Sequence, residues 1–250
     1  MPRRREPVPT VCIPWRPSPS RIPLFDRVMT FWKRVGWPIV TADSDTEIFS
    51  LAQARNNAVA KANTEVVVIN DADTIPELAN IRLAIADALA DPRGVCWPFT
   101  HYRILPPEYL HTPFDRLADV PIINTWDGEG IAGVGGCIVA AQSEYWRLGG
   151  QPPEFIGWGW EDTAFTMIVE TLSEARRVEG NVYAFEHNTE AAAYTQARAD
   201  SPGWDRDNKR NEALCKPYQN ACGRQWLMRE VLRLREGTRP LTDYGFPIGR

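Results

Sequence analysis

Short apolar runs alternate with helix-like segments over the first hundred residues of the chain. Runs of strand length lie at 10–15, 38–41, 65–69 and 94–99. Segments with helical spacing of apolar residues lie at 22–35, 51–62 and 77–89. Ser50 stands where it would cap the second of these helices. This alternation is typical of a mostly parallel β-sheet flanked by helices, so the pattern predicts an α/β fold.

The second half of the chain has a weaker pattern. We expect a strand at 138–141, a helix at 161–172, a strand at 177–185 and an amphipathic helix at 221–235. Residues 101–130 are rich in Pro, Asp and aromatic residues, so they predict a long functional loop. Residues 189–210 are polar and small and predict a mobile segment. Because there is no internal repeat and no linker, the pattern predicts a single domain.

Two acidic residues follow the most hydrophobic of the predicted strands. Asp71-Ala72-Asp73 comes directly after Val66-Val67-Val68-Ile69. In parallel α/β sheets, ligands bind beyond the carboxyl ends of the strands. Carboxylate oxygens there suit a hard divalent cation, although Asp side chains also stabilise ordinary turns. The position of this pair favours a metal site.

A second acidic pair stands beside glycine and tryptophan. The segment reads Gly157-Trp158-Gly159-Trp160-Glu161-Asp162 and leads into an apolar stretch. Acidic residues suit the first turn of a helix, where backbone N–H groups are unpaired. Alone, this segment fits a structural helix start as well as a functional site. His187 ends another predicted strand and offers a nitrogen ligand that Mn²⁺ tolerates better than Mg²⁺, although a single histidine is more often structural.

Taken together, these residues resemble the GT-A class of nucleotide-sugar-dependent glycosyltransferases, similar to family 2 with a C-terminal motif of β-1,4-galactosyltransferase type. The resemblance covers roughly residues 10–190, and its specificity comes from the order of the motifs. The matches are Pro14-Trp15-Arg16 within an I-P-x-R element, Asp43 after the second strand, Arg55 in an R-N-x-A helix, Asp71-Ala72-Asp73 as D-x-D, Gly135-Gly136 before the acceptor strand, 157–165 as G-W-G-x-E-D-x-x-F, and His187 at the third metal ligand.

The resemblance implies a role for each matched residue. Asp162 would be the general base, and Glu161 would hold hydroxyls of the acceptor or donor. Mn²⁺ or Mg²⁺ would be held by Asp71, Asp73 and His187. The nucleotide-sugar, expected to be a UDP-sugar, would contact Pro14, Trp15, Arg16, Asp43, Arg55, Asp71 and Ala72. The acceptor side would comprise Gly135, Gly136, Trp158, Gly159 and Trp160. The Glu-Asp order matches inverting members and implies a single displacement.

The resemblance also divides the chain. It implies a nucleotide-binding half at about 10–100 and an acceptor and catalytic half at about 101–190, followed by the mobile segment and C-terminal helix of 191–250. Two departures from the family pattern stand out. Trp160 replaces a glycine, which narrows the acceptor side, and Thr163-Ala164 lacks the third acid that usually follows the pair. Donor-sugar identity and galactosyl specificity therefore stay open.

Composition narrows the setting of the protein. The chain has 250 residues, a net charge of −4 and five cysteines, none in a C-x-x-C pair. This charge gives no general electrostatic footprint for nucleic acid. We see no apolar run long enough to span a membrane and no apolar core of a signal peptide. With the odd cysteine count, these features predict a cytoplasmic protein. Within the resemblance, the Golgi members carry a membrane anchor and lumenal disulfides, so the chain is closer in style to a bacterial or phage enzyme, in the host cytoplasm if phage-encoded.

Two other classes of function compete with the glycosyltransferase. A sugar nucleotidyltransferase would need a glycine-rich phosphate loop after the first strand, where this chain has Pro14-Trp15-Arg16-Pro17-Ser18-Pro19. A non-catalytic nucleotide-sugar or carbohydrate-binding module would use the aromatic residues as a platform, but the retention of both acidic pairs argues against it. The acceptor hydroxyl stays open: a glycan, a lipid-linked glycan, a protein side chain and a hydroxymethylated DNA base all fit.

Overall fold

Six strands form the large β-sheet of the protein, in the order β2-β1-β3-β8-β5-β9. The computed structural model describes residues 8–127, 134–157, 159–186 and 204–235, with only the backbone at 204–206. The strands of the large sheet are β1 (Thr10–Pro14), β2 (Ile39–Ala42), β3 (Val66–Asn70), β5 (Gly94–Trp97), β8 (Cys137–Ala141) and β9 (Glu174–Arg177). β8 runs antiparallel to its neighbours β3 and β5, and the other pairs are parallel. The expected α/β class with a mostly parallel sheet is confirmed.

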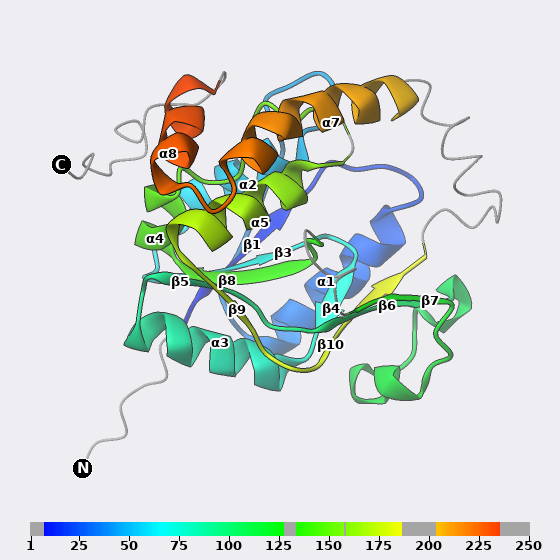
Figure 1. Ribbon diagram of the computed structural model, residues 1–250. Helices are drawn as coiled ribbons and strands as arrows, with labels where there is room; N and C mark the ends of the chain where they lie inside the picture. Colours follow the sequence, from blue (N-terminus) through cyan, green and yellow to red (C-terminus); the bar gives the residue numbers. More distant parts are fainter. Residues whose placement is uncertain (1–7, 128–133, 158, 187–203, 236–250) are drawn as a thin grey trace, which may run out of the picture.

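Helices cover both faces of this sheet (Figure 1). They are α1 (Ile22–Val35), α2 (Leu51–Ala60), α3 (Leu78–Ala90), α4 (Gln142–Arg147), α5 (Glu161–Leu172), α7 (Trp204–Ala221) and α8 (Gln225–Leu234). In Figure 1, α1 and α3 lie on one side of the sheet, and α2, α4 and α5 lie on the other, with α7 and α8 packed outside α5. The core is therefore built in layers around the buried strands β1, β3 and β8.

Local sequence explains why the first helices begin and end where they do. A proline in the first turn opens α1, and Gly36 closes it in the left-handed conformation at φ 81°. Ser50 caps α2, since its side chain accepts a hydrogen bond from the backbone N–H of Gln53. These two helices have the expected starting residues, and α1 also has the expected end. The predicted cap at Ser50 is confirmed.

A second sheet of four short strands, in the order β4-β10-β6-β7, lies beside the first. Its strands are β4 (Thr74–Pro76), β6 (His101–Leu105), β7 (Asn124–Trp126) and β10 (Asn181–Phe185). The prediction of a loop over 101–130 was therefore wrong, because β6, β7 and two 3₁₀ helices at Pro107–Tyr109 and Phe114–Asp119 lie in it. These strands pair with segments far away in the sequence, which a local pattern does not reveal.

Two further predicted elements are divided in the structure. The single strand expected at 177–185 comprises the last residue of β9 and all of β10, which belong to different sheets and are separated at Gly180, where φ is 146°. The helix expected at 221–235 comprises the end of α7 and all of α8, with Gly223 at φ 72° between them. Of the mobile segment expected at 189–210, residues from 204 onward are helical, and the preceding ones lie outside the described residues.

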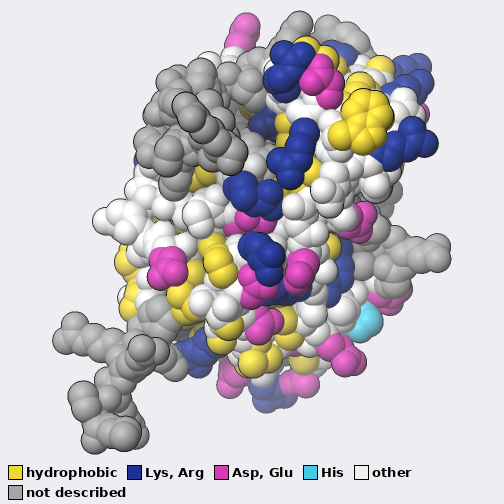
Figure 2. Space-filling view, turned by 60° about the vertical axis from the view of Figure 1, so that its left-hand side comes forward, with side chains coloured by type: hydrophobic (Ala, Val, Ile, Leu, Met, Phe, Trp, Pro, Cys, Tyr) yellow, Lys and Arg dark blue, Asp and Glu magenta, His cyan; other side chains and the backbone are white. Residues whose placement is uncertain are grey.

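Within the described ranges, we find no helix long and apolar enough to cross a membrane. All five cysteines are free thiols. Acidic side chains lie beside Lys and Arg across the middle of the face shown in Figure 2. Among the ion pairs of the described residues, Arg176 pairs with both Asp91 and Glu174, at 2.9 Å and 2.8 Å.

Candidate active site

A buried arginine joins the two acidic motifs. Arg55 lies on α2 with its side chain 1% exposed. Its Nε and Nη2 atoms donate to both carboxylate oxygens of Asp71 at 2.7–3.0 Å, and its Nη1 donates to Asp162 Oδ1 at 2.5 Å. Gln151 Oε1 accepts a further bond from Nη1 at 2.8 Å. The guanidinium thus links the D-x-D turn to the Glu-Asp pair through charge-assisted hydrogen bonds.

The glycine pair lies within this cluster. Gly136 donates its backbone N–H to Asp71 Oδ2 at 3.0 Å, and its carbonyl accepts the N–H of Asp71 at 2.8 Å. A Cβ atom at Gly135 would stand 2.5 Å from Asp162 Oδ2 and 2.6 Å from Arg55 Nη2. Only glycine allows the backbone to approach the two charged groups so closely. The structure therefore brings together Arg55, Asp71, Gly135, Gly136 and Asp162.

The segment before α5 is held in a strained conformation. Trp160 has φ 76°, and no other non-glycine residue in the described ranges has a positive φ. This left-handed conformation is uncommon for side chains other than glycine, Asn and Asp. In the family that the sequence resembles, the residue at this position is glycine. Glu161 and Asp162 follow as the first residues of α5, where the helix dipole favours negative charge.

Contacts from two other elements fix this segment in place. Gly157 donates its N–H to the carbonyl of Phe49 at 2.9 Å, next to the start of α2. On α7, Asn208 Oδ1 accepts the indole N–H of Trp160 at 2.7 Å, and Asn211 donates to the carbonyl of Ile156 at 3.1 Å. These bonds stabilise the positive φ of Trp160 and thereby set the start of α5.

The first-strand motif organises a neighbouring loop. Pro14 ends β1, and Trp15 stacks on Phe25 of α1 with ring centroids 4.1 Å apart. Arg16 binds both oxygens of Asp43 at 2.9 Å. Its other nitrogens donate to backbone carbonyls at Ser44, Thr46 and Glu47. The ion pair between Arg16 and Asp43, together with these backbone bonds, therefore holds the loop between β2 and α2 in place.

Burial and mutual repulsion shape the electrostatics of the acidic cluster. Glu161 is 8% exposed. Burial, reinforced by the charge of Asp162, raises the pKa of Glu161 to about 8, although Arg55 acts in the opposite direction. Burial also raises the pKa of Asp71, with Arg55 again opposing and the charges of Asp162 and Asp73 adding to the rise. The site therefore holds more negative charge than Arg55 alone balances.

This excess of carboxylate suits a divalent cation. Within the described ranges, no three His, Cys, Asp or Glu side chains are arranged around one metal position. Both oxygens of Asp71 accept bonds from Arg55 or Gly136, whereas Asp73 lies 4.0 Å from Arg21 Nη1 with its side chain 17% exposed. Ala72, between them, is buried. The side chains of Asp71 and Asp73 are similarly exposed, at 16% and 17%, so either carboxylate could contact an ion completed by substrate phosphates.

Two predicted site residues, His187 and Trp158, lie outside the described residues. Gly159, with φ 96°, lies between Trp158 and Trp160. Sequence reasoning missed Gln151, Asn208 and Arg21, which contact the cluster or its supporting loop. No sequence motif marks Gln151 or Asn208. Arg21 follows the matched Pro14-Trp15-Arg16 element by a few residues, and this closeness is the signal that could have identified it.

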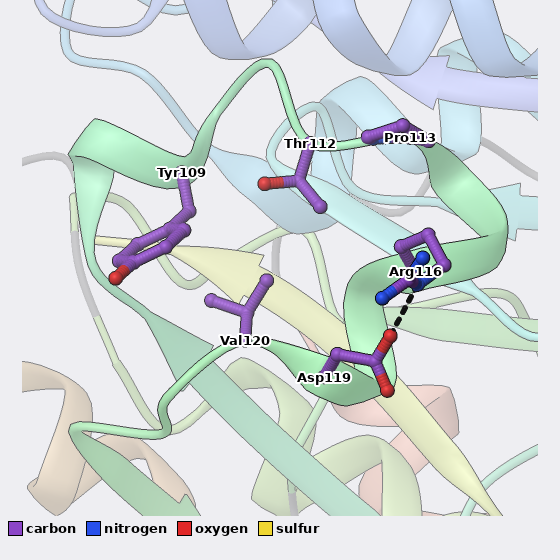
Figure 3. Close-up of a pocket in the computed structure, with 6 residues that line it drawn as sticks. All are labelled: Tyr109, Thr112, Pro113, Arg116, Asp119 and Val120. Carbon is purple, nitrogen blue, oxygen red and sulfur yellow. Dashed lines mark hydrogen bonds and ion pairs between the residues drawn. The ribbon is translucent and has the colours of Figure 1, made fainter.

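A shallow pocket of about 300 Å³ lies elsewhere, on the segment between β6 and β7 (Figure 3). It is lined by Tyr109, Thr112, Pro113, Arg116, Asp119 and Val120. Arg116 and Asp119 form an ion pair at its edge, as the dashed line shows. None of the acidic-cluster residues lines it, so we do not assign the chemistry to this pocket.

Among known proteins, the chain matches solved structures by their fold, but it matches no family model and no curated sequence. Among solved structures, two of Drosophila β1,4-galactosyltransferase 7 match at 16% and 17% identity, with TM-scores of 0.45 and 0.42. One is a mutant complex with manganese, UDP-Gal and xylobiose, and the other is the catalytic domain with xylobiose. A structure of GalNAc-T7 with UDP, GalNAc and Mn²⁺ matches at 12% identity and a TM-score of 0.49.

These neighbours are glycosyltransferases by name. The two galactosyltransferase matches cover 67% of this chain and 63% of theirs, and the GalNAc-T7 match covers 95% of this chain and 49% of its own. The chain therefore spans less than two thirds of each neighbour. Because all three TM-scores lie below 0.5, the activity and ligands of this chain have to be argued from its own residues.

Proposed function

We propose that the chain is a metal-dependent glycosyltransferase that moves a sugar from a nucleotide-sugar, expected to be UDP-linked, to an acceptor hydroxyl. The observation that carries the proposal is the meeting of four separate segments in one cluster. Four segments that are distant in the sequence contact one another here, and they supply Arg55, Asp71, Gly135-Gly136 and Asp162. Glu161 adjoins Asp162 in the chain. A helix start or a turn alone would not require this convergence.

Asp162 is the proposed general base. Its Oδ1 atom is fixed by Arg55, and its Oδ2 atom lies on the side of Gly135. A carboxylate held in this way keeps one oxygen oriented for a proton from an incoming hydroxyl. The 19% exposure of the side chain leaves it accessible from solvent. Attack by that hydroxyl in a single displacement would give inversion at the anomeric carbon.

Glu161 is proposed to hold hydroxyl groups. Since its pKa is raised to about 8, its carboxyl group is mostly protonated at neutral pH. A protonated carboxyl both donates and accepts a hydrogen bond. It therefore suits a sugar hydroxyl better than a second carboxylate would, and it adds no further negative charge beside Asp162.

Asp73, with Asp71 and His187, would hold a cation such as Mn²⁺ or Mg²⁺. When bound, such an ion stabilises the charge that develops on a departing diphosphate. Pro14, Trp15, Arg16, Asp43, Arg55 and Ala72 are proposed on the nucleotide side. Gly135, Gly136, Trp158, Gly159 and Trp160 are proposed on the acceptor side. A soluble, cytoplasmic enzyme of one domain stays our expectation.

Donor binding provides the test of the proposed class. Thermal shift with UDP-, GDP- and TDP-sugars, each with and without Mn²⁺, should show stabilisation by one nucleotide class that depends on the metal. Asp73→Ala should lose this metal-dependent shift. Asp115→Asn, an exposed change in the 3₁₀ helix at Phe114–Asp119, is the control and should keep it. Equal shifts with Mn²⁺ and with EDTA would overturn the metal assignment, and no shift with any donor would overturn the class.

A further inference from the structure

One face of the small sheet carries aromatic and amide side chains. Tyr102 on β6 pairs with Trp126 on β7, and Ile104 pairs with Asn124. Because side chains two residues apart share a face, these four lie on one side of the sheet. Through β10, Ala184 aligns with both Ile104 and Thr74, so Thr74 of β4 belongs to the same face. We call Tyr102, Trp126 and Asn124 the aromatic ledge.

The aromatic ledge adjoins the acidic cluster. Thr74 donates its hydroxyl to the carbonyl of Gly136 at 2.9 Å. A Cβ atom at Gly136 would stand 2.9 Å from Tyr102 Cε2, whereas the neighbouring Gly135 faces Asp162. The glycine pair therefore separates the proposed base from the ring of Tyr102. In agreement, burial and then the charges of Asp73, Asp71 and Asp162 raise the pKa of Tyr102.

The outer part of the ledge is open. Trp126 is 38% exposed and leans on Tyr102, with ring centroids 5.0 Å apart and an angle of 47° between the planes. All three residues of β7 are exposed, including Asn124. The 47° tilt and this exposure leave an indole surface beside a side-chain amide. By contrast, the indole N–H of Trp160 is bonded to Asn208 on α7.

An aromatic surface beside an amide matches one class of acceptor. A pyranose has a face of C–H groups and a rim of hydroxyls, so it can lie on an indole and bond to an amide. The carboxylate of Asp162, which lies next to Gly135, disfavours an approaching anion, such as a nucleic acid backbone or an acidic lipid headgroup. A neutral acceptor is therefore favoured.

We propose that the aromatic ledge is the acceptor subsite and that it binds a neutral pyranose, with the sugar ring on Trp126 and a hydroxyl on the amide of Asn124. This inference rests on the proposed function, since it uses Asp162 as the base on the other side of the glycine pair. It adds the small sheet, which contains none of the motif residues that resemble the family, to the acceptor side.

Ligand-observed NMR tests the subsite directly. Saturation transfer from the full chain to methyl β-glycopyranosides of xylose, galactose, glucose and N-acetylglucosamine, with UDP and Mn²⁺ present, should reach the ring C–H protons of at least one sugar. Trp126→Ala should weaken binding of that sugar about tenfold or more, and Trp126→Phe should retain most of it. Trp226→Ala removes a more exposed tryptophan, 72% exposed on α8, and should leave binding unchanged.

Other results of these measurements would overturn the proposal that the aromatic ledge binds the acceptor. Binding by Trp126→Ala equal to that of the unaltered chain would overturn the ledge, as would saturation transfer to 5-hydroxymethyl-2′-deoxyuridine and to no pyranoside. No transfer to any of the sugars would also overturn it. The donor-dependent thermal shift, measured on the same variants, separates these results from failure of the proposed function: a kept shift with no sugar binding rejects the ledge alone.

Discussion

The two sheets of this protein carry different kinds of side chain: the large sheet supplies a buried network of charged groups, and the small sheet supplies an exposed aromatic surface. The large sheet and its helix α2 supply Arg55 and Asp71, which lie in a buried network. The small sheet supplies Tyr102 and Trp126, which lead outward to solvent. Gly135-Gly136 lies where the two meet. The difference indicates that positions around the charged network tolerate little change, whereas the small sheet can change what it binds without disturbing that network.

Removing the guanidinium of Arg55, which binds both Asp71 and Asp162, should cause the largest loss of stability. Arg55→Met would leave the carboxylates of Asp71 and Asp162 partly buried and unpaired, which should cost about 3–5 kcal/mol of unfolding free energy. Arg103→Met in the small sheet is the matched change. Arg103 donates to the neutral oxygens of Asn181 and Thr125, so its loss should cost about 1 kcal/mol.

Urea denaturation of the two variants measures this difference. A midpoint for Arg55→Met close to that of Arg103→Met would show that the buried ion pairs do not hold the large-sheet site together. A larger loss for Arg103→Met would reverse the assignment of rigidity to the two sheets.

A smaller effect should follow from the protonation of Glu161. Its pKa is about 8 in the folded protein, against an ordinary value of 4.5, because of burial, Asp162 and Asp71, with Arg55 opposing. A raised carboxyl pKa favours the folded state fully below pH 4.5, and this contribution is lost as the pH rises toward 8. Glu161→Gln, which stays neutral, should therefore gain stability relative to the unaltered chain over this window.

Thermal unfolding between pH 4.5 and pH 8.5 checks the sign of this effect. The Tm of Glu161→Gln should exceed that of the unaltered chain by about 2 °C or more at pH 8, with a difference that shrinks at acidic pH. Glu170→Gln, an exposed change on the same helix α5, should show no such trend. A constant difference across the pH range would contradict the raised pKa of Glu161.

Much of the large sheet could be predicted from local sequence, because strands such as β1, β3 and β8 are continuous apolar runs and α1 and α2 carry their own start signals. β3 is buried at every residue, and α5 begins at the expected Glu161. The small sheet could not be predicted in this way. β7 has three exposed residues, β4 has three residues in all, and each strand finds its partner far away in the chain.

The candidate site shows the same limit. The motifs identified Arg55, Asp71 and Asp162 separately, but no local pattern tells that one guanidinium binds both acids across 16 and 107 residues of sequence. The same holds for Asn208, which contacts Trp160 across 48 residues. Tertiary contacts of this kind decide how each carboxylate is held and which of its oxygens is left for chemistry.

The most direct measurement of the central claim is the turnover of Asp162→Asn, measured with the donor and the acceptor sugar that the binding experiments identify. Loss of a general base should lower kcat by about 10² or more, while the metal-dependent thermal shift with the donor survives and Asp115→Asn retains full turnover. Turnover of Asp162→Asn near that of the unaltered chain would contradict the account, because the proton would then have to be taken by another group.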